Sequence, residues 1–242
     1  MPSHGIIYGP ISSPQSGRFL GVDPLPPPYR LCTYDCVYCA FRSLAPGPRG
    51  TRWPTPGEIG SALANALPDA GPLDSITLSG HGEPTLHPRF GSLVGEVLSA
   101  ARHGRPGVPV RIVTNGSMAC HEDIRRALDL LDERVVKLDA GMERVCRPDP
   151  DHPTGAVIAA LPLLRDLTIQ SCFVEGAVAN TDADSVQHWV DLLVELRPQA
   201  VQIYTPWWLD GEASITPAPA WRLSEIATQL EDQSGIHPTV YG

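Results

Sequence analysis

CTYDCVYC, residues 32–39, places three thiols within eight residues in the spacing Cys-x3-Cys-x2-Cys. Structural zinc sites are closed by four Cys or His ligands, yet no histidine lies between Cys32 and His81. A [4Fe–4S] cluster held by three thiolates leaves one iron open to a small molecule. We therefore predict that Cys32, Cys36 and Cys39 are cluster ligands and that a fourth coordination position is reserved for another group.

The remaining three cysteines, Cys120, Cys146 and Cys172, stand alone in the sequence. Cys172 lies inside an apolar strand, as is typical of a small core residue. The sequence therefore predicts one cluster and no second one.

On both sides of the cysteine stretch, short β-rich runs alternate with segments of helical periodicity. The predicted strands are 17–23, 74–80, 109–116, 134–141, 167–176 and 200–206. The predicted helices are 56–67, 88–101, 124–131, 154–165, 183–196 and 220–233. Strict alternation implies parallel strands with right-handed crossovers. Periodicity alone leaves two architectures open, a partial barrel and an open doubly wound sheet.

Polar residues follow most of these strands. They are 79–83 (SGHGE), Thr114 with Asn115, Lys137 with Asp139, Glu175, and Tyr204 with Thr205. Such residues also make ordinary turns after strands. Because the carboxyl ends of parallel strands form the ligand-binding rim of barrels and open sheets alike, five such groups predict a pocket there.

At 242 residues and 42% hydrophobic, the chain can bury a full core, and we expect a single domain over 1–242. The start of the chain lacks the pattern of a signal peptide, and no apolar run is long enough to span a bilayer. We therefore expect a cytoplasmic protein without a membrane partner. The net charge of −9 makes nucleic acid an unlikely partner.

The cysteine spacing, with the aromatic Tyr38 before the last cysteine, resembles the signature of the radical S-adenosylmethionine (SAM) enzymes. The GHGEP segment, 80–84, and the strand–helix order strengthen this resemblance, which covers about residues 5–235. Four stretches are most similar to a subgroup related to wyosine-base synthases of tRNA modification: 17–39, 79–88, 114–117 and 136–141. The resemblance implies an α/β fold, a partial (β/α)6 TIM-like barrel.

By this resemblance, the three clustered cysteines hold three irons, and the amino and carboxylate groups of SAM chelate the fourth. Glu83 accepts hydrogen bonds from the SAM ammonium, while Gly80 and Gly82 allow close approach of the backbone. His81 departs from the small residue found there in many branches of the family.

The resemblance also assigns the remaining SAM contacts. Asn115 and Asp139 hold the carboxylate or the ribose hydroxyls. Val174 and Tyr204 flank the adenine, and Tyr38 packs near it.

The implied chemistry is reductive cleavage of SAM to a 5′-deoxyadenosyl radical, which abstracts hydrogen from a small or medium organic substrate. Two enzymatic alternatives stay open, an activase for a glycyl-radical enzyme and a tRNA-base modification enzyme. A non-catalytic iron–sulfur or zinc protein is the alternative outside enzymology.

Three residues are candidates for substrate binding. Trp207 and Trp208 lie at the expected mouth of the site, where they could stack on a ring or simply pack the open edge of the barrel. Lys137, the only lysine of the chain, could hold a phosphate or carboxylate. The alternative for Lys137 is an ion pair that neutralises Glu83.

An external one-electron donor, a flavodoxin or a ferredoxin, is the expected redox partner. Residues 1–52 carry five arginines against two aspartates. Arg30, Arg42 and Arg49 form a basic rim that could receive such an acidic partner.

Overall fold

The computed structural model describes residues 5–48, 50–208 and 214–242. Its main sheet has eight strands in the order β1-β2-β3-β4-β5-β6-β8-β10. They are β1 (Ile7–Ser13), β2 (Gly17–Val22), β3 (Ser75–Leu78), β4 (Val110–Thr114), β5 (Glu133–Lys137), β6 (Leu167–Cys172), β8 (Ala200–Tyr204) and β10 (Thr239–Tyr241). A second sheet pairs β7 (Val174–Gly176) with β9 (Ile215–Pro217) in antiparallel fashion.

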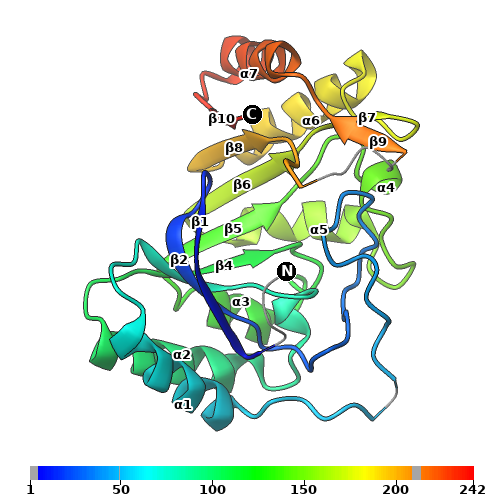
Figure 1. Cartoon of the computed structure of the whole chain (residues 1–242). Coiled ribbons are helices and arrows are strands. Elements are labelled where there is room, and N and C mark those ends of the chain that lie inside the picture. The colour runs from blue at the N-terminus through cyan, green and yellow to red at the C-terminus, as the bar shows by residue number, and fades with distance from the viewer. Residues whose placement is uncertain (1–4, 49, 209–213) are drawn as a thin grey trace.

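The order of the strands decides between the two predicted architectures. From β2 to β10 every neighbouring pair in the main sheet is parallel, and the strands follow one another in chain order. A doubly wound sheet would reverse its order at a switch point. The sheet instead curls in one direction (Figure 1). The partial barrel is therefore confirmed, with an additional antiparallel strand, β1, at one edge.

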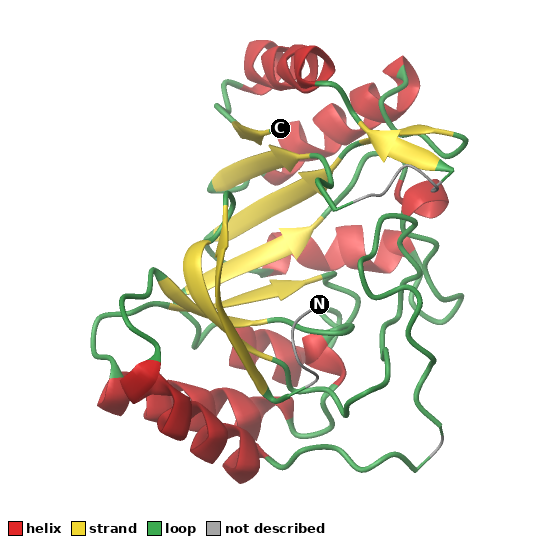
Figure 2. Cartoon of the chain, viewed as in Figure 1, coloured by secondary structure: helices red, strands yellow, loops and turns green. Residues whose placement is uncertain are grey.

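Helices cover the outer face of the curled sheet (Figure 2). They are α1 (Pro56–Ala66), α2 (Phe90–Gly104), α3 (Glu122–Leu128), α4 (Met142–Val145), α5 (Thr154–Ala160), α6 (Ala183–Leu196) and α7 (Ala220–Ser234), with 3-10 turns at Leu67–Asp69, Pro84–Leu86 and Leu161–Leu163. The long loop between β2 and α1 lies at the end toward which the arrows of β4, β5 and β6 point (Figure 1). This loop carries the three clustered cysteines, so the fold brings them to the carboxyl rim.

Local signals explain where the predicted helices begin. The Thr55 side chain accepts from the Glu58 N–H at 3.2 Å, and the Glu58 carboxylate accepts from the Thr55 N–H at 2.7 Å, which closes a capping box at α1. Asp182 likewise caps α6 by accepting from Ser185 N at 3.0 Å. Both helices start where the sequence predicts.

The expected strand 167–176 is wrong in one respect, because the chain breaks at Phe173 into β6 and β7. The Asn180 side chain causes the break: its Oδ1 accepts from Val174 N at 2.9 Å, and its Nδ2 donates to Cys172 O at 2.8 Å. These backbone groups are thereby taken from the ladder of the main sheet. The chain turns away and pairs with β9 instead.

The core fills the space between the sheet and the helices. Trp189 of α6 is buried, contacts Phe173 edge-on at 5.4 Å between ring centroids, and donates from its indole nitrogen to Leu138 O at 3.0 Å. All four residues of β3 are buried, as expected for a central parallel strand. In the described ranges, no helix is both long and apolar enough to cross a membrane.

Candidate cofactor site at the carboxyl rim

The thiols of Cys32 and Cys39 each face hydrogen-bond donors. The Cys32 sulfur receives the backbone N–H of Tyr34, and the Asn115 amide nitrogen lies 3.6 Å from it. The Arg30 guanidinium is within hydrogen-bonding reach of the Cys39 sulfur. Donors directed at sulfur stabilise thiolates and tune the potential of an iron–sulfur cluster. This donor set is therefore suited to cluster ligands.

The third thiol, Cys36, has a partner that the sequence does not reveal. Cys146 is buried, its thiol is within hydrogen-bonding reach of the Cys36 thiol, and it donates to Asp139 Oδ2 at 3.2 Å. Cys146 stands alone in the sequence but lies beside Cys36 in the fold. The contact arises because Val37 N donates to Val145 O at 2.8 Å, which joins two loops far apart in sequence.

Glu83 occupies the centre of the GHGEP and TNG loops and is almost fully buried. Its Oε1 accepts from Thr85 N at 3.0 Å, from Thr85 Oγ1 at 2.5 Å and from Thr114 Oγ1 at 2.6 Å. Its Oε2 accepts from Asn115 N at 2.7 Å. Burial raises the pKa of the Glu83 carboxyl, and these hydrogen bonds oppose the shift. Oε2, with a single protein donor, is the atom that retains room for a cationic ligand.

The two glycines of GHGEP allow a close approach, but of protein backbone. A Cβ atom at Gly82 would overlap the Leu31 backbone, where Glu83 N donates to Leu31 O at 2.8 Å. A Cβ at Gly80 would overlap the carboxylate of Asp23, which directly follows β2. The glycines thus fasten this loop to β2 and to the cysteine loop.

His81, the residue that departs from the family pattern, also joins the GHGEP loop to the segment after β2 and to the cysteine loop. Its Nδ1 contacts the Asp23 carboxylate, which also accepts from His81 N at 3.1 Å and from Leu25 N at 3.0 Å. Its ring meets Phe41 of the cysteine loop edge-on at 4.8 Å. Asp23 is absent from the predicted site residues, although an acid at a strand end is the same signal that identified Asp139.

We expect Gly82→Ala to lower the free energy of unfolding by about 1–3 kcal/mol, because the added methyl group overlaps backbone that cannot move away. Gly95→Ala is the matched control: Gly95 lies in α2 with open space around its Cα. Alanine there should stabilise the protein by about 0.5–1 kcal/mol, because glycine is unfavourable within a helix. Urea unfolding of both variants checks the prediction; equal stabilities would contradict it.

Asp139 is the centre of a second group of site residues. Its Oδ1 accepts from Cys172 N at 2.7 Å and lies 3.3 Å from Lys137 Nζ, while its Oδ2 accepts from the Tyr38 hydroxyl. Lys137 Nζ also donates to the Tyr204 hydroxyl at 2.9 Å and lies 4.4 Å from the centre of its ring. The alternative of an ion pair between Lys137 and Glu83 is therefore wrong, and the lysine pairs with Asp139.

The two tryptophans differ in their surroundings. Trp208 donates from its indole nitrogen to Tyr38 O at 2.9 Å and packs near Tyr204, with 6.4 Å between ring centroids. Trp207 is 72% exposed. Trp208 therefore contacts the site directly, and Trp207 meets the Trp208 ring edge-on at 5.8 Å between ring centroids. Val174 is buried in the core, with its N–H bound to the Asn180 side chain.

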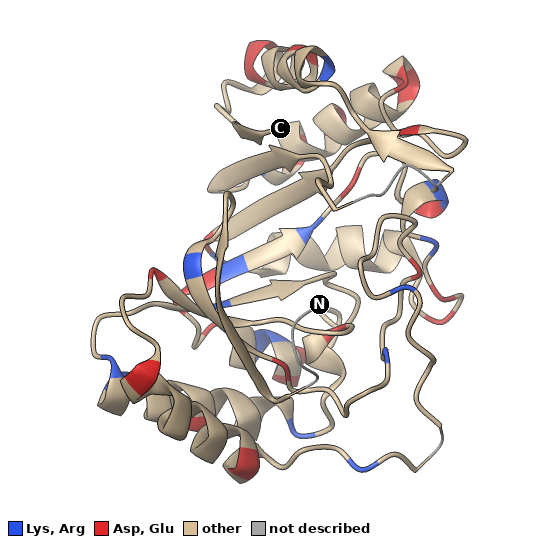
Figure 3. Cartoon of the chain, in the orientation of Figure 1, with Lys and Arg blue, Asp and Glu red and all other residues tan. Residues whose placement is uncertain are grey.

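Two arginines of the basic rim share one acidic partner. Arg30 lies 3.2 Å and Arg42 3.0 Å from the carboxylate of Asp35, and Arg30 is mostly buried. Arg49 lies outside the described residues. Charged residues of both signs alternate along the loops at this end of the barrel (Figure 3). Arg30 therefore lies mostly buried beside Asp35, and a role of this rim in docking a redox partner stays a prediction.

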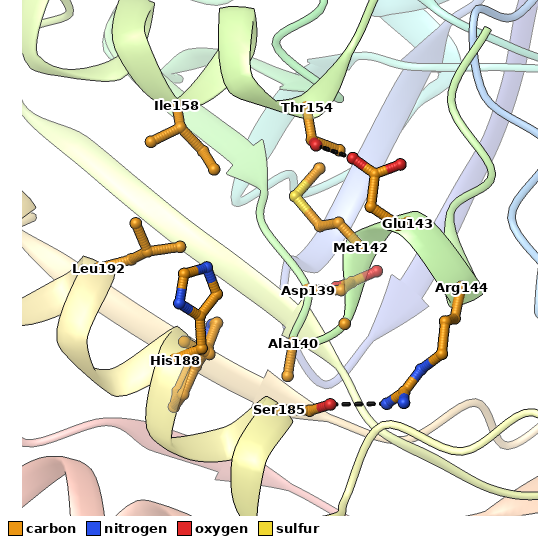
Figure 4. Close-up of a pocket in the computed structure, with 12 residues that line it drawn as sticks. Asp139, Ala140, Met142, Glu143, Arg144, Thr154, Ile158, Ser185, His188 and Leu192 are labelled. Atoms are coloured by element: carbon orange, nitrogen blue, oxygen red, sulfur yellow. Dashed lines mark hydrogen bonds between the residues drawn. The ribbon is translucent and has the colours of Figure 1, made fainter. Parts of the chain in front are cut away.

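A pocket of about 290 Å³ lies outside the barrel, between α4, α5 and α6. Its polar walls are paired with each other: Arg144 donates to Ser185, and Thr154 binds Glu143 (Figure 4). Of the predicted site residues, Asp139 alone lines it. Asp139 lies between the pocket and the cysteine site, and the two sites are otherwise lined by different residues.

An unpaired polar atom tests whether these residues fit a bound group. The hydroxyl of Tyr34 is buried and has no hydrogen-bond partner among the described residues. Burial raises the pKa of Tyr34, and the charges of Cys146, Cys36, Glu83 and Cys32 add to this shift. An unpaired buried hydroxyl, together with hydrogen-bond donors at the thiols of Cys32 and Cys39, fits a site completed by a cluster and its ligand.

A parallel half barrel with a three-cysteine loop at its carboxyl rim defines a cofactor-dependent enzyme of the barrel class. The sequence profile of the radical SAM superfamily matches residues 27–193, and the chain belongs to this superfamily. Its members use a [4Fe–4S] cluster and SAM, and the chain is accordingly an enzyme.

Relatives and solved structures agree with this assignment. A "UPF0026 protein" of Helicobacter pylori is 32% identical over 148 residues, which cover 59% of this chain and 46% of that protein. SuiB of Streptococcus suis, solved with its precursor peptide SuiA, gives a TM-score of 0.64 at 16% identity, covering 92% of this chain and 48% of that one. TYW1 with a lysine–pyruvate adduct gives 0.60 at 16% identity, covering 91% and 76%.

At such identities the solved structures show the shared fold alone. The chain spans less than half the length of the first curated relatives that it matches.

Proposed function

We propose that this protein holds one [4Fe–4S] cluster on Cys32, Cys36 and Cys39, cleaves SAM reductively and abstracts hydrogen from an organic substrate. The observation that carries the proposal is the junction of three loops. The Asn115 side chain reaches the Cys32 sulfur, while its backbone N–H binds Glu83. The cluster ligands and the proposed ligand of the SAM ammonium are thus held in one hydrogen-bonded unit. The whole chain, 1–242, acts as a single domain in this proposal.

When bound, the cluster and SAM supply the electron transfer and the radical. The chain's own residues bind and orient these groups. Glu83 Oε2 accepts from the ammonium of SAM, and Gly80 and Gly82 hold the Glu83 loop against the cysteine loop. Asn115 and Asp139 secure the neighbouring loops, because most of their polar atoms already bind protein groups.

The aromatic residues shield the site from water. The rings of Tyr38 and Tyr204 pack against Lys137, and Trp208 packs beside both tyrosines, so these residues close one side of the rim. Val174 and Tyr204 bound the place of the adenine. Exclusion of water and quenching groups is what a reactive radical requires of its protein.

Lys137 is the proposed contact for an anionic group on the substrate. Its ammonium binds Asp139 and the Tyr204 hydroxyl and keeps a further donor. Trp208, beside Tyr204, lines the approach, and Trp207 offers an exposed ring. An external flavodoxin or ferredoxin supplies the electron.

The test is anaerobic incubation of the reconstituted protein with SAM, dithionite and deuterated candidate substrates. Deuterium in 5′-deoxyadenosine would identify the substrate. A protein that cleaves SAM yet gains no label from any protein, tRNA or small-molecule candidate would contradict the abstraction step. Label from tRNA would favour the alternative suggested by the wyosine-related sequence stretches.

The protein should bind about four irons per chain, the content of one cubane. Cys146→Ala should keep this content, because Cys146 donates to Asp139 and serves as a neighbour of Cys36 rather than as a ligand. Iron analysis after anaerobic reconstitution measures both. About eight irons in the parent, or a loss of iron in Cys146→Ala, would contradict the single three-cysteine site.

A further inference from the structure

The Asn115 side chain, directly after β4, joins the TNG loop to the cysteine loop. It is 7% exposed, and its Nδ2 donates to Thr33 Oγ1 at 2.9 Å and lies 3.6 Å from Cys32 Sγ. The second distance is within the range of an N–H···S hydrogen bond, because sulfur is larger than oxygen. An amide nitrogen carries two hydrogens. Both are therefore committed to the cysteine loop, one to a hydroxyl and one to a predicted cluster ligand.

The orientation of this amide is fixed by its other end. Asn115 Oδ1 accepts from the Ser117 N–H at 2.9 Å. A backbone N–H can only donate, so it must face the oxygen of the amide and not the nitrogen. A flipped side chain would set two donors against each other. The nitrogen, and not the oxygen, therefore faces Cys32.

Thr33 holds the amide in place from the cysteine loop. Its hydroxyl donates to Ser117 Oγ at 2.8 Å, which leaves the lone pairs of Oγ1 to accept from Asn115. Its carbonyl accepts from Asp149 N at 2.7 Å, which anchors this part of the loop. Thr33 and Ser117 are both buried. The amide is thus fixed by partners on two loops.

The backbone of Asn115 has a different task from its side chain. Its N–H donates to Glu83 Oε2 at 2.7 Å, next to the proposed place of the SAM ammonium. The side chain contacts the cysteine loop instead. A substitution of the side chain can therefore separate an effect on the cluster from an effect on Glu83.

We propose that the Asn115 amide donates a hydrogen bond to the Cys32 sulfur in the loaded enzyme and raises the reduction potential of the cluster, with Thr33 as the residue that positions the amide. The inference rests on the proposed function. A donor at a ligand sulfur stabilises the reduced form more, because that form carries one more negative charge. Asn115 thus acts on the electron transfer, whereas the family resemblance implies that it binds SAM.

Asn115→Ala removes the amide and keeps the backbone N–H that binds Glu83. In the reconstituted protein without SAM, we expect a midpoint potential that is more negative than in the parent. A redox titration followed by electron paramagnetic resonance measures it. Asn65→Ala, at an exposed position in α1, is the matched control and should leave the potential unchanged.

Thr33→Val tests the positioning role and replaces a hydroxyl by a methyl group. The Asn115 amide then stays in reach of Cys32 but loses the acceptor that fixes its direction. We expect a negative shift of the potential that is smaller than in Asn115→Ala. This variant also decides the matter if Asn115→Ala assembles no cluster.

Equilibrium binding of SAM to the oxidised protein is the second readout. Asn115→Ala should bind SAM as the parent does. An unchanged or more positive potential in these variants would overturn the inference, and so would weaker SAM binding by Asn115→Ala, which would assign the amide to SAM. A failure of the proposed function is distinct, because the parent itself would then assemble no cluster or cleave no SAM.

Discussion

Cys36→Ala should abolish the reductive cleavage of SAM and leave the protein folded. Three thiolates hold the cluster as a unit, and the loss of one removes an iron ligand that no other residue in the CTYDCVYC stretch replaces. The fold should persist because most of its burial comes from strand and helix faces such as those of β3 and α6 and not from the cysteine ligands. Circular dichroism and 5′-deoxyadenosine production measure the two effects.

A further variant is needed because the Cys146 thiol lies beside that of Cys36 and could replace it as an iron ligand. The double variant Cys36→Ala/Cys146→Ala removes this possibility, and Cys120→Ala, at an exposed position, is the control that should retain full activity. Unfolding of Cys36→Ala would favour a structural metal, whose binding contributes directly to folding. A folded double variant that still cleaves SAM would contradict the cluster assignment.

Glu83→Gln should weaken SAM binding about ten- to a hundredfold, because a charge-assisted hydrogen bond of about 1.5–3 kcal/mol to the ammonium is lost. The structure also predicts that Glu83→Gln lowers the stability of the fold. Each carboxylate oxygen accepts from a backbone N–H, Oε1 from Thr85 N and Oε2 from Asn115 N, so the amide nitrogen of glutamine would face an N–H in either position. We expect a further loss of about 1–3 kcal/mol in the free energy of unfolding.

Equilibrium binding of SAM below the melting temperature separates the two effects. Glu122→Gln, on the exposed side of α3, is the charge-matched control and should change neither quantity appreciably. Unchanged SAM affinity in a folded Glu83→Gln protein would mean that the GHGEP loop has another role.

The sequence predicts the β/α alternation because its determinants are local. Caps such as Thr55 and the apolar faces of α2 and α6 lie within a few residues of the elements they define. The elements it misses depend on distant partners. β1 contains Pro10, which argues against a strand, yet it pairs along an edge. The break at Phe173 depends on the Asn180 side chain.

The site also has features that the local sequence predicts and features that depend on distant partners. The residues at strand ends can be predicted, because parallel strands must end at one rim. The pairing of these residues cannot be predicted from the sequence. Glu83 follows β3 and Lys137 ends β5. Because β4 lies between these two strands, they are about 10 Å apart. Lys137 therefore pairs with Asp139 of its own segment. A charge count over residues 1–52 likewise cannot show that Asp35 pairs with both Arg30 and Arg42.

One measurement tests the central claim most directly: the products formed when the anaerobically reconstituted protein is mixed with SAM and a one-electron reductant. The account predicts 5′-deoxyadenosine and methionine in equal amounts, dependent on both the reductant and the cluster. A protein that carries about four irons per chain, binds SAM and still forms no 5′-deoxyadenosine, with or without candidate substrates, would contradict it.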